Sequence, residues 1–146
     1  TYSPIRGQVE PRNTFTLYSE AEGKVIQSAI IVGNRVSKGQ SILSIDASLR
    51  TTNEKILEQN IRKAQLDYEV AKKTFNRYKN LLQNGNTSTT EYENAKAQFE
   101  AAEVQLEVGE QQLKSAKIQV SQTKVIAPSA GIIVEKKVNQ GEYVQP

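Results

Sequence analysis

Two long stripes of apolar and small side chains run through the middle of this chain, and they complement each other only when one of them is reversed. In both stripes the spacing alternates between three and four residues, which is typical of a coiled-coil seam. The first stripe consists of Leu57, Ile61, Ala64, Tyr68, Ala71, Phe75, Tyr78 and Leu82. The second consists of Tyr92, Ala95, Phe99, Ala102, Leu106, Gly109, Leu113, Ala116 and Val120. The pattern predicts two long helices that pack antiparallel.

A reversal of the chain at Asn84-Gly85 places large side chains of one stripe opposite small ones of the other, which fills the space between two close helices without voids. Gly109 lies in the middle of the second helix, where Gly costs about 1 kcal/mol relative to Ala. We interpret it as the point where the backbone approaches Ile61. The expected layers are Tyr78/Tyr92, Phe75/Ala95, Ala71/Phe99, Tyr68/Ala102, Ala64/Leu106, Ile61/Gly109 and Leu57/Leu113.

The turn between the helices has its own sequence pattern. Gly85 suits the left-handed position that ends a helix, and Ser88-Thr89-Thr90-Glu91 matches a capping box that begins the next one. At about 1.5 Å per residue the rod would be about 50 Å long. On its flanks, the same register predicts solvated ion pairs of Lys72 with Glu103 and of Glu58 with Lys117.

Composition excludes several classes of function. The 146 residues contain neither Cys nor His, which removes thiol nucleophiles, the usual zinc sites and the commonest general base. Basic and acidic residues are interspersed and the net charge is only +3, which indicates a solvated surface with no face dedicated to nucleic acid. No apolar run approaches the roughly 20 residues that span a bilayer. We expect no enzyme activity, no cofactor and no metal, and we expect any anchor of the protein to lie outside these residues.

The two ends of the chain predict β structure and repeat each other at an offset of 108 residues. We expect strands in Thr14 to Tyr18, Lys24 to Val32 and Ser41 to Ile45, and again in 124–126, 131–134 and 143–144. The two copies indicate half-motifs that close on each other into one small sandwich, with the helices inserted between them. The matching positions are Gly23 and Gly131, Val25 and Ile133, Gly33 and Gly141, and Val36 and Val144.

The fold class is therefore α+β, with three parts. Residues 1–18 are expected to be a strand leading in from a neighbouring domain. Residues 19–47 and 122–146 are expected to form one discontinuous β domain, and residues 48–121 a coiled-coil α-hairpin with its tip at 83–88.

The β halves resemble the lipoyl/biotinyl-like module, a barrel-sandwich hybrid. The resemblance rests on Glu22-Gly23-Lys24-Val25, on Val32 to Asp46, on Ala127 to Ile133 and on Val138 to Val144. In carrier domains of this kind an acceptor Lys typically follows an Asp between the halves. Here Asp46 is followed by Ala47, so the resemblance does not extend to a swinging-arm carrier.

A lipoyl-like module split at this point by a helical hairpin resembles the periplasmic adaptor family, also called membrane fusion proteins. Adaptors that dock onto outer-membrane channels carry Arg, three residues, Leu, six residues and Ser across the hairpin turn. Arg77, Leu81 and Ser88 have this spacing. From its position beside Leu82, we expect Leu81 to point away from the partner helix.

The resemblance implies a fragment of a tripartite efflux adaptor that bridges an inner-membrane transporter, proton-driven or ABC type, to an outer-membrane channel in a Gram-negative periplasm. It implies that Arg77, Leu81 and Ser88 contact the channel and that copies associate into a ring, a trimer or hexamer. The Gln-rich second helix could also pack against copies of itself. Three alternatives stay open: an adaptor of type I protein secretion, a lipoyl/biotinyl-like carrier domain, and a cytosolic coiled coil that spaces two partners.

Overall fold

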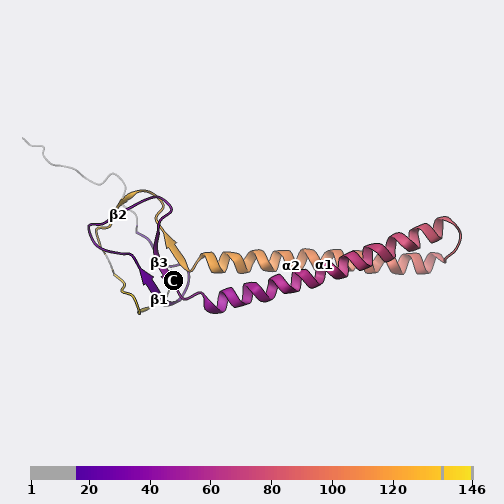
Figure 1. The fold of residues 1–146 in the computed structure, drawn as a ribbon, viewed down its shortest axis with the longest axis horizontal. Helices are drawn as coiled ribbons and strands as arrows, with labels where there is room; N and C mark the ends of the chain where they lie inside the picture. Colours follow the sequence, from indigo (N-terminus) through magenta and orange to yellow (C-terminus); the bar gives the residue numbers. More distant parts are fainter. Residues whose placement is uncertain (1–15, 136, 146) are drawn as a thin grey trace, which may run out of the picture.

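In a computed structural model of the chain, residues 16–135 and 137–145 are described. Two long helices project from one side of a small β domain (Figure 1). The predicted leading strand over 1–18 lies mostly outside the described residues, and 16–18 have no regular secondary structure. The elements are β1 (Gly23–Ser28), β2 (Arg35–Val36), β3 (Ser41–Ile45), α1 (Ser48–Gln83), α2 (Thr89–Ser121), β4 (Lys124–Ile126), β5 (Gly131–Ile132) and β6 (Tyr143–Val144).

The helices occupy the predicted stretch, and the chain reverses between them. α1 has 36 residues and α2 has 33, so the hairpin is about 50 Å long. The two helices remain in contact along the rod and cross in the view of Figure 1. The predicted antiparallel hairpin is confirmed.

The seam has the predicted register near its base and near its tip. A Cβ atom built on Gly109 would lie 3.3 Å from Cγ1 of Ile61, so the backbone of α2 does approach that side chain. Nearer the tip, the Phe75 ring lies between two rings of α2, with centroids 5.7 Å from Tyr92 and 5.2 Å from Phe99. Those two residues flank Ala95, the predicted partner of Phe75. Aromatic pairs at such distances stabilise beyond their buried area.

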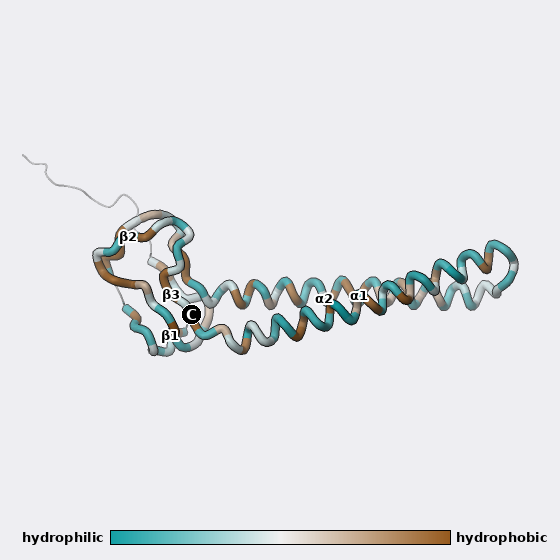
Figure 2. Tube along the Cα trace, viewed as in Figure 1, coloured by the Kyte–Doolittle hydropathy of each residue, from teal (hydrophilic) through white to brown (hydrophobic). Residues whose placement is uncertain are grey.

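Small residues are the most buried part of the seam. They let the larger side chains of the facing helix close over them, as in knobs-into-holes packing. Figure 2 shows the complementary pattern: apolar segments recur along both helices between hydrophilic ones, and apolar residues gather in the β domain. The buried helix residues are Ala64, Ala95, Gly109 and Ala116.

The predicted ion pairs across the helices do not form among the described residues. The ion pair present there joins Lys63 Nζ to Asp67 Oδ2 at 2.9 Å within α1. Lys72 instead lies 6.0 Å from the ring centroid of Tyr68, on its own helix. Both partners of each predicted pair are exposed and well hydrated, so little free energy favours the paired geometry. The opposite charges of the two helices therefore stay separate on the surface of the rod.

The β domain has a four-stranded antiparallel sheet in the order β4-β3-β1-β6 and a two-stranded sheet of β2 and β5. The predicted repeat is visible in the pairing. Gly23 pairs with Val144, and its counterpart Gly131 pairs with Val36. The hydrogen bond from the Val25 N–H to the Glu142 carbonyl, 2.8 Å, recurs as Ile133 N–H to Asn34, 2.9 Å.

Each half thus completes the other, as the repeat predicted. The buried cluster is built by Ala21, Val25, Leu43 and Ile45 from the first half. Partly buried residues from both halves pack against it, namely Ile30, Val125, Val138 and Val144. The core depends on the second half although the two are separated by more than 70 residues of hairpin.

Two predicted strands are shorter than expected. The strand predicted over Lys24 to Val32 ends at Ser28, and the one predicted over 131–134 ends at Ile132. The first apolar run continues to a turn at Val32-Gly33, and the second continues through 133–135 without regular secondary structure. Ile31, Val32 and Val134 are exposed there. A short apolar run shows where a strand begins better than where its ladder of hydrogen bonds stops.

Candidate functional site: the hairpin tip

The turn at the end of the rod is held by hydrogen bonds that end α1 in one defined geometry. Gly85 has φ of +72°, the left-handed conformation that glycine adopts most easily. Its N–H donates to the Leu82 carbonyl at 3.0 Å, and the Asn86 N–H donates to the Leu81 carbonyl at 2.8 Å. This pair of bonds is a Schellman motif, so the predicted role of Gly85 is confirmed.

The start of α2 is held by Ser88. Its Oγ accepts a hydrogen bond from the Glu91 N–H at 3.1 Å, which makes it the N-cap. In a capping box the Glu91 carboxylate would accept a hydrogen bond from the backbone N–H of Ser88. Here it instead accepts one from the Thr87 hydroxyl at 2.5 Å. Thr87 is a tip residue that the sequence pattern did not single out. Its hydroxyl lies one residue before the cap, within reach of the same carboxylate.

The structure places Arg77 and Leu81 on successive turns of α1 just below this turn. Arg77 is exposed, and its Cζ lies 5.6 Å from the ring centroid of Tyr78, a cation–π contact. Leu81 is half-buried rather than directed fully outward. It lies next to Leu82 of the seam, and its carbonyl accepts the hydrogen bond from the Asn86 N–H that closes the turn. Ser88 is exposed on the far side of the turn.

These groups suit recognition of a protein surface. Arg77 offers several N–H donors that match carbonyl or carboxylate oxygens. The cap uses a lone pair of the Ser88 oxygen, which leaves the hydroxyl hydrogen free to donate. Leu81 adds a partly exposed apolar edge beside them. Because the turn is fixed at both ends, little conformational entropy remains to be lost when a partner orders it.

The junction between hairpin and β domain bears on the carrier alternative. Asp46 Oδ1 accepts hydrogen bonds from the Ser48 hydroxyl at 2.6 Å and from the Ser48 N–H at 3.0 Å. Ala47 is the residue that precedes α1, and its carbonyl accepts from the Thr51 N–H at 2.8 Å. The position where a carrier would present its lysine is therefore the start of a long helix.

Two hydrogen bonds fix the base of the rod to the β domain. The Ile45 N–H donates to the carbonyl of the buried Thr123 at 2.7 Å, which joins the strand before α1 to the second residue after α2. The Arg50 guanidinium donates to the Glu22 carbonyl at 3.3 Å. The ends of the hairpin lie side by side, as predicted for an insertion, so the direction of the rod is set by the β domain.

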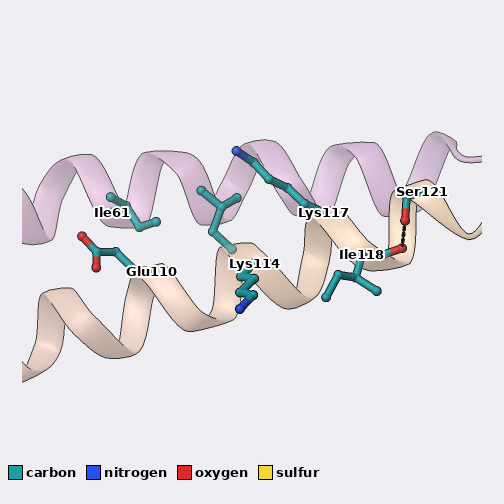
Figure 3. Close-up of a pocket in the computed structure, with 7 residues that line it drawn as sticks. Ile61, Glu110, Lys114, Lys117, Ile118 and Ser121 are labelled. Carbon is teal, nitrogen blue, oxygen red and sulfur yellow. Dashed lines mark hydrogen bonds between the residues drawn. The ribbon is translucent and has the colours of Figure 1, made fainter.

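A shallow groove lies between the helices near this base. Figure 3 shows Ile61 projecting from α1 toward α2, while Lys114 and Lys117 extend from α2 in opposite directions. The Ser121 hydroxyl donates to the Ile118 carbonyl at 2.6 Å, the dashed line in that view. The groove is an open flank of the seam, lined by side chains that already have packing or solvated roles.

Within the described residues, no three His, Cys, Asp or Glu side chains cluster in a way that could hold a metal ion. In the same part of the chain, none of the helices has the length and apolar character needed to cross a bilayer.

A family model, "EMRA, alpha-helical hairpin domain", matches residues 46–129, more than half of the chain. A curated relative is an uncharacterized protein of Haemophilus influenzae, 29% identical over 138 residues. The alignment covers 94% of this chain but 32% of that protein, so the chain spans about a third of the length of its relative.

Two solved structures share the fold. The membrane fusion protein Spr0693 from Streptococcus pneumoniae R6 has a TM-score of 0.66 at 19% identity, covering 85% of this chain and 53% of that one. The periplasmic adaptor protein EmrA has a TM-score of 0.58 at 13% identity, covering 88% and 68%. The α+β arrangement of a hairpin on a curled antiparallel sheet is common to them. The chain therefore belongs to the EmrA alpha-helical hairpin domain family and has the fold of periplasmic adaptor, or membrane fusion, proteins.

Proposed function

We propose that this chain is the hairpin and lipoyl-like portion of an efflux adaptor, whose tip contacts the periplasmic end of an outer-membrane channel. The whole protein would link that channel to an inner-membrane transporter, proton-driven or ABC type. It would act in the periplasm of a Gram-negative bacterium and be anchored to the inner membrane through segments outside this chain. The role is one of binding and spacing, with no catalytic step.

One observation carries the proposal: a capped, rigid turn at the end of a rod about 50 Å long presents Arg77 and Ser88 to solvent. Arg77 would donate charge-assisted hydrogen bonds to carbonyl or carboxylate oxygens of the channel. Leu81 would bury its remaining exposed edge, which is a smaller apolar gain than a fully exposed Leu would give. Ser88 would combine helix capping with a contact through its hydroxyl hydrogen.

A single tip of this size would bind weakly, because only a few side chains reach the partner. Several copies arranged in a ring, such as a trimer or hexamer, would engage one channel together and gain avidity without new kinds of contact. The lipoyl-like domains would hold the copies at the same distance from the channel, so that all tips can reach it. Position 47 holds an alanine that leads directly into α1, where a carrier domain would present its lysine. This argues against the carrier alternative.

The test uses Arg77→Ala and Leu81→Ser in the whole protein, expressed in cells with its channel. Both variants are expected to reduce site-specific cross-linking to the channel and to reduce efflux, while far-ultraviolet circular dichroism shows unchanged helicity. Lys55→Ala is the matched control, since it removes an exposed positive charge near the base of the same helix. Cross-linking and efflux that stay at wild-type level in both tip variants would refute the assignment of the site.

A further inference from the structure

The sequence contains one Asn-Gly pair, Asn84-Gly85, and it lies in the turn at the end of the rod far from the β domain (Figure 1). Asparagine is among the chemically least durable residues of proteins. It loses its side-chain amide as ammonia when the next backbone nitrogen attacks it. A following glycine favours this attack, because it has no Cβ to block the approach. The tip therefore carries the pair of residues in this chain that is most prone to deamidation.

The surroundings of the pair leave room for the reaction. Asn84 and Gly85 are both exposed, so water has access to them. No atom of the described residues lies within 4 Å of a Cβ built on Gly85, so the space beside its backbone is open. Asn86 and Asn94 are exposed as well, but the residues that follow them carry a Cβ. Exposure alone therefore does not distinguish Asn84, whereas its neighbour does.

The closed turn nevertheless holds the reacting atoms apart. Asn84 has φ of −93° and ψ of 3°, and this ψ turns its Cβ away from the Gly85 nitrogen. A five-membered ring through both atoms needs them nearly eclipsed about the bond from Cα to the carbonyl carbon. In addition, the Gly85 N–H donates to the Leu82 carbonyl at 3.0 Å, and this bond must break before the nitrogen can react. The reaction therefore requires a local opening of the turn.

We propose that Asn84 is a deamidation site whose rate is set by opening of the turn, and that its conversion disables the tip. The first part depends on the turn alone. The second part rests on the proposed function, because it takes the tip as the surface that contacts the channel.

The covalent step needs only water and hydroxide. The Gly85 nitrogen gives its proton to hydroxide and attacks Cγ of Asn84. A bond from that nitrogen to Cγ forms, the bond from Cγ to the side-chain nitrogen breaks, and this nitrogen takes a proton from water and leaves as ammonia. Water then opens the five-membered imide at one of its two carbonyls. One opening gives aspartate, and the other gives isoaspartate, in which the backbone runs through the former side chain.

Either product weakens the turn. The carboxylate of an aspartate at position 84 lies at the C-terminal end of α1, where the last carbonyls carry partial negative charge. The last turn of α1 has no basic residue to offset it. Isoaspartate adds a methylene to the backbone between positions 84 and 85, which displaces the Gly85 and Asn86 N–H groups from their carbonyl partners. The docking surface beside Leu81 then loses its fixed shape.

Peptide mass spectrometry tests the site. The whole protein is incubated at neutral and at mildly alkaline pH, and trypsin then releases residues 80–96 as one peptide, which includes Asn84, Asn86 and Asn94. Conversion at Asn84 is expected to be several-fold faster than at Asn86 or Asn94 and to rise with pH. In urea that unfolds the chain, it is expected to be several-fold faster still. Conversion at Asn84 that is no faster than at Asn86, or equally fast in folded and unfolded chains, would overturn the proposal.

A substitution on the other side of the turn tests whether its opening sets the rate. Ser88→Ala removes the oxygen that accepts a hydrogen bond from the Glu91 N–H and leaves the Asn-Gly pair unchanged. It is expected to speed the conversion of Asn84 several-fold. Ser115→Ala is the matched control, since it makes the same change at an exposed position in the middle of α2 and should leave the rate at the wild-type value. A Ser88→Ala variant that converts at the wild-type rate would refute control by the turn.

Two charge variants test the consequence for the tip. Asn84→Asp in the whole protein is expected to lower the melting temperature and to reduce cross-linking to the channel several-fold. Asn86→Asp adds the same charge on the N-terminal side of α2, where negative charge is favoured, and should melt close to the wild type. An Asn84→Asp variant that melts and cross-links as Asn86→Asp does would refute the loss of tip function. The conversion rates and melting temperatures are measured without the channel. Failure of tip docking would instead appear as unchanged cross-linking in Arg77→Ala.

Discussion

The side chain of Ile61 lies against the backbone of Gly109, with only 3.3 Å between Ile61 Cγ1 and the position a Cβ on residue 109 would take. This distance is shorter than ordinary van der Waals contact, so the layer has no room for a larger side chain. Gly109→Leu is expected to destabilise the hairpin by about 1–3 kcal/mol through overpacking. Thermal unfolding followed by circular dichroism measures the loss.

Gly109→Ala separates packing from helix propensity at the same site. Alanine gains up to about 1 kcal/mol of helix propensity, and the crowded contact with Ile61 offsets part of that gain. A near-neutral Ala variant beside a strongly destabilised Leu variant is the expected result. An unchanged melting temperature for Gly109→Leu would contradict the register of the seam.

Phe99 joins two aromatic rings of α1, with centroids 5.4 Å from Tyr68 and 5.2 Å from Phe75. Phe99→Ala removes both ring contacts and leaves a gap beside Ala71. Because Phe99 is half-buried, the expected loss of stability is about 2 kcal/mol, below the 3–5 typical of a fully buried Phe. Gln98→Ala, an exposed neighbour on the same turn, is the control and should change stability by less than about 0.5 kcal/mol. Equal melting temperatures for the two variants would show that this cluster does not hold the hairpin together.

The sequence predicted the hairpin well because its signals are local and repeated. Helical periodicity, a Gly that takes positive φ at position 85 and a Ser that caps at position 88 each act within one or two turns. The 108-residue repeat was also sufficient to predict that Gly23 and Gly131 occupy equivalent places in the β domain.

What the sequence did not predict depends on side-chain geometry and on long-range hydrogen bonds. The extent of β1 and β5 is decided by which backbone groups find partners, which the apolar run from Lys24 to Val32 does not encode. Leu81 is half-buried, whereas its position beside Leu82 in the helical pattern predicted only that it points away from the partner helix. The absence of ion pairs between α1 and α2 in the described rod follows from rotamers of exposed side chains, on which the sequence has little influence.

The turn at the tip is conformationally demanding but has free space around it. Gly85 has φ of +72°, and no atom lies within 4 Å of a Cβ built there. Gly85→Ala is therefore expected to cost about 1 kcal/mol from backbone strain alone. Gly85→Asn is the matched variant and should cost less, because Asn tolerates the left-handed conformation. Thermal unfolding of both variants checks the order, and an Ala variant as stable as the wild type would contradict the observed turn.

Asp46 provides a prediction about pH. Hydrogen bonds from the Ser48 hydroxyl and the Ser48 N–H, with a further contribution from Lys24, hold the pKa of Asp46 below its usual 3.8. A carboxylate whose pKa is lowered by folding stabilises the fold above its unfolded pKa, and that contribution is lost as the pH falls through the folded pKa. Asp46→Asn should therefore be less stable than the wild type at pH 6, and the difference should shrink as the pH falls below 3.8.

The comparison is made as melting temperature against pH for the wild type, Asp46→Asn and Ser48→Ala. Ser48→Ala removes the hydroxyl donor but keeps the backbone donor, so it should raise the pKa of Asp46 toward its usual value and reduce the pH dependence without abolishing it. Because Asp46 is exposed, the effect is expected to be small and to weaken in high salt. A difference between wild type and Asp46→Asn that stays constant from pH 6 to about pH 2.5 would show that the carboxylate does not anchor the start of α1 through its charge.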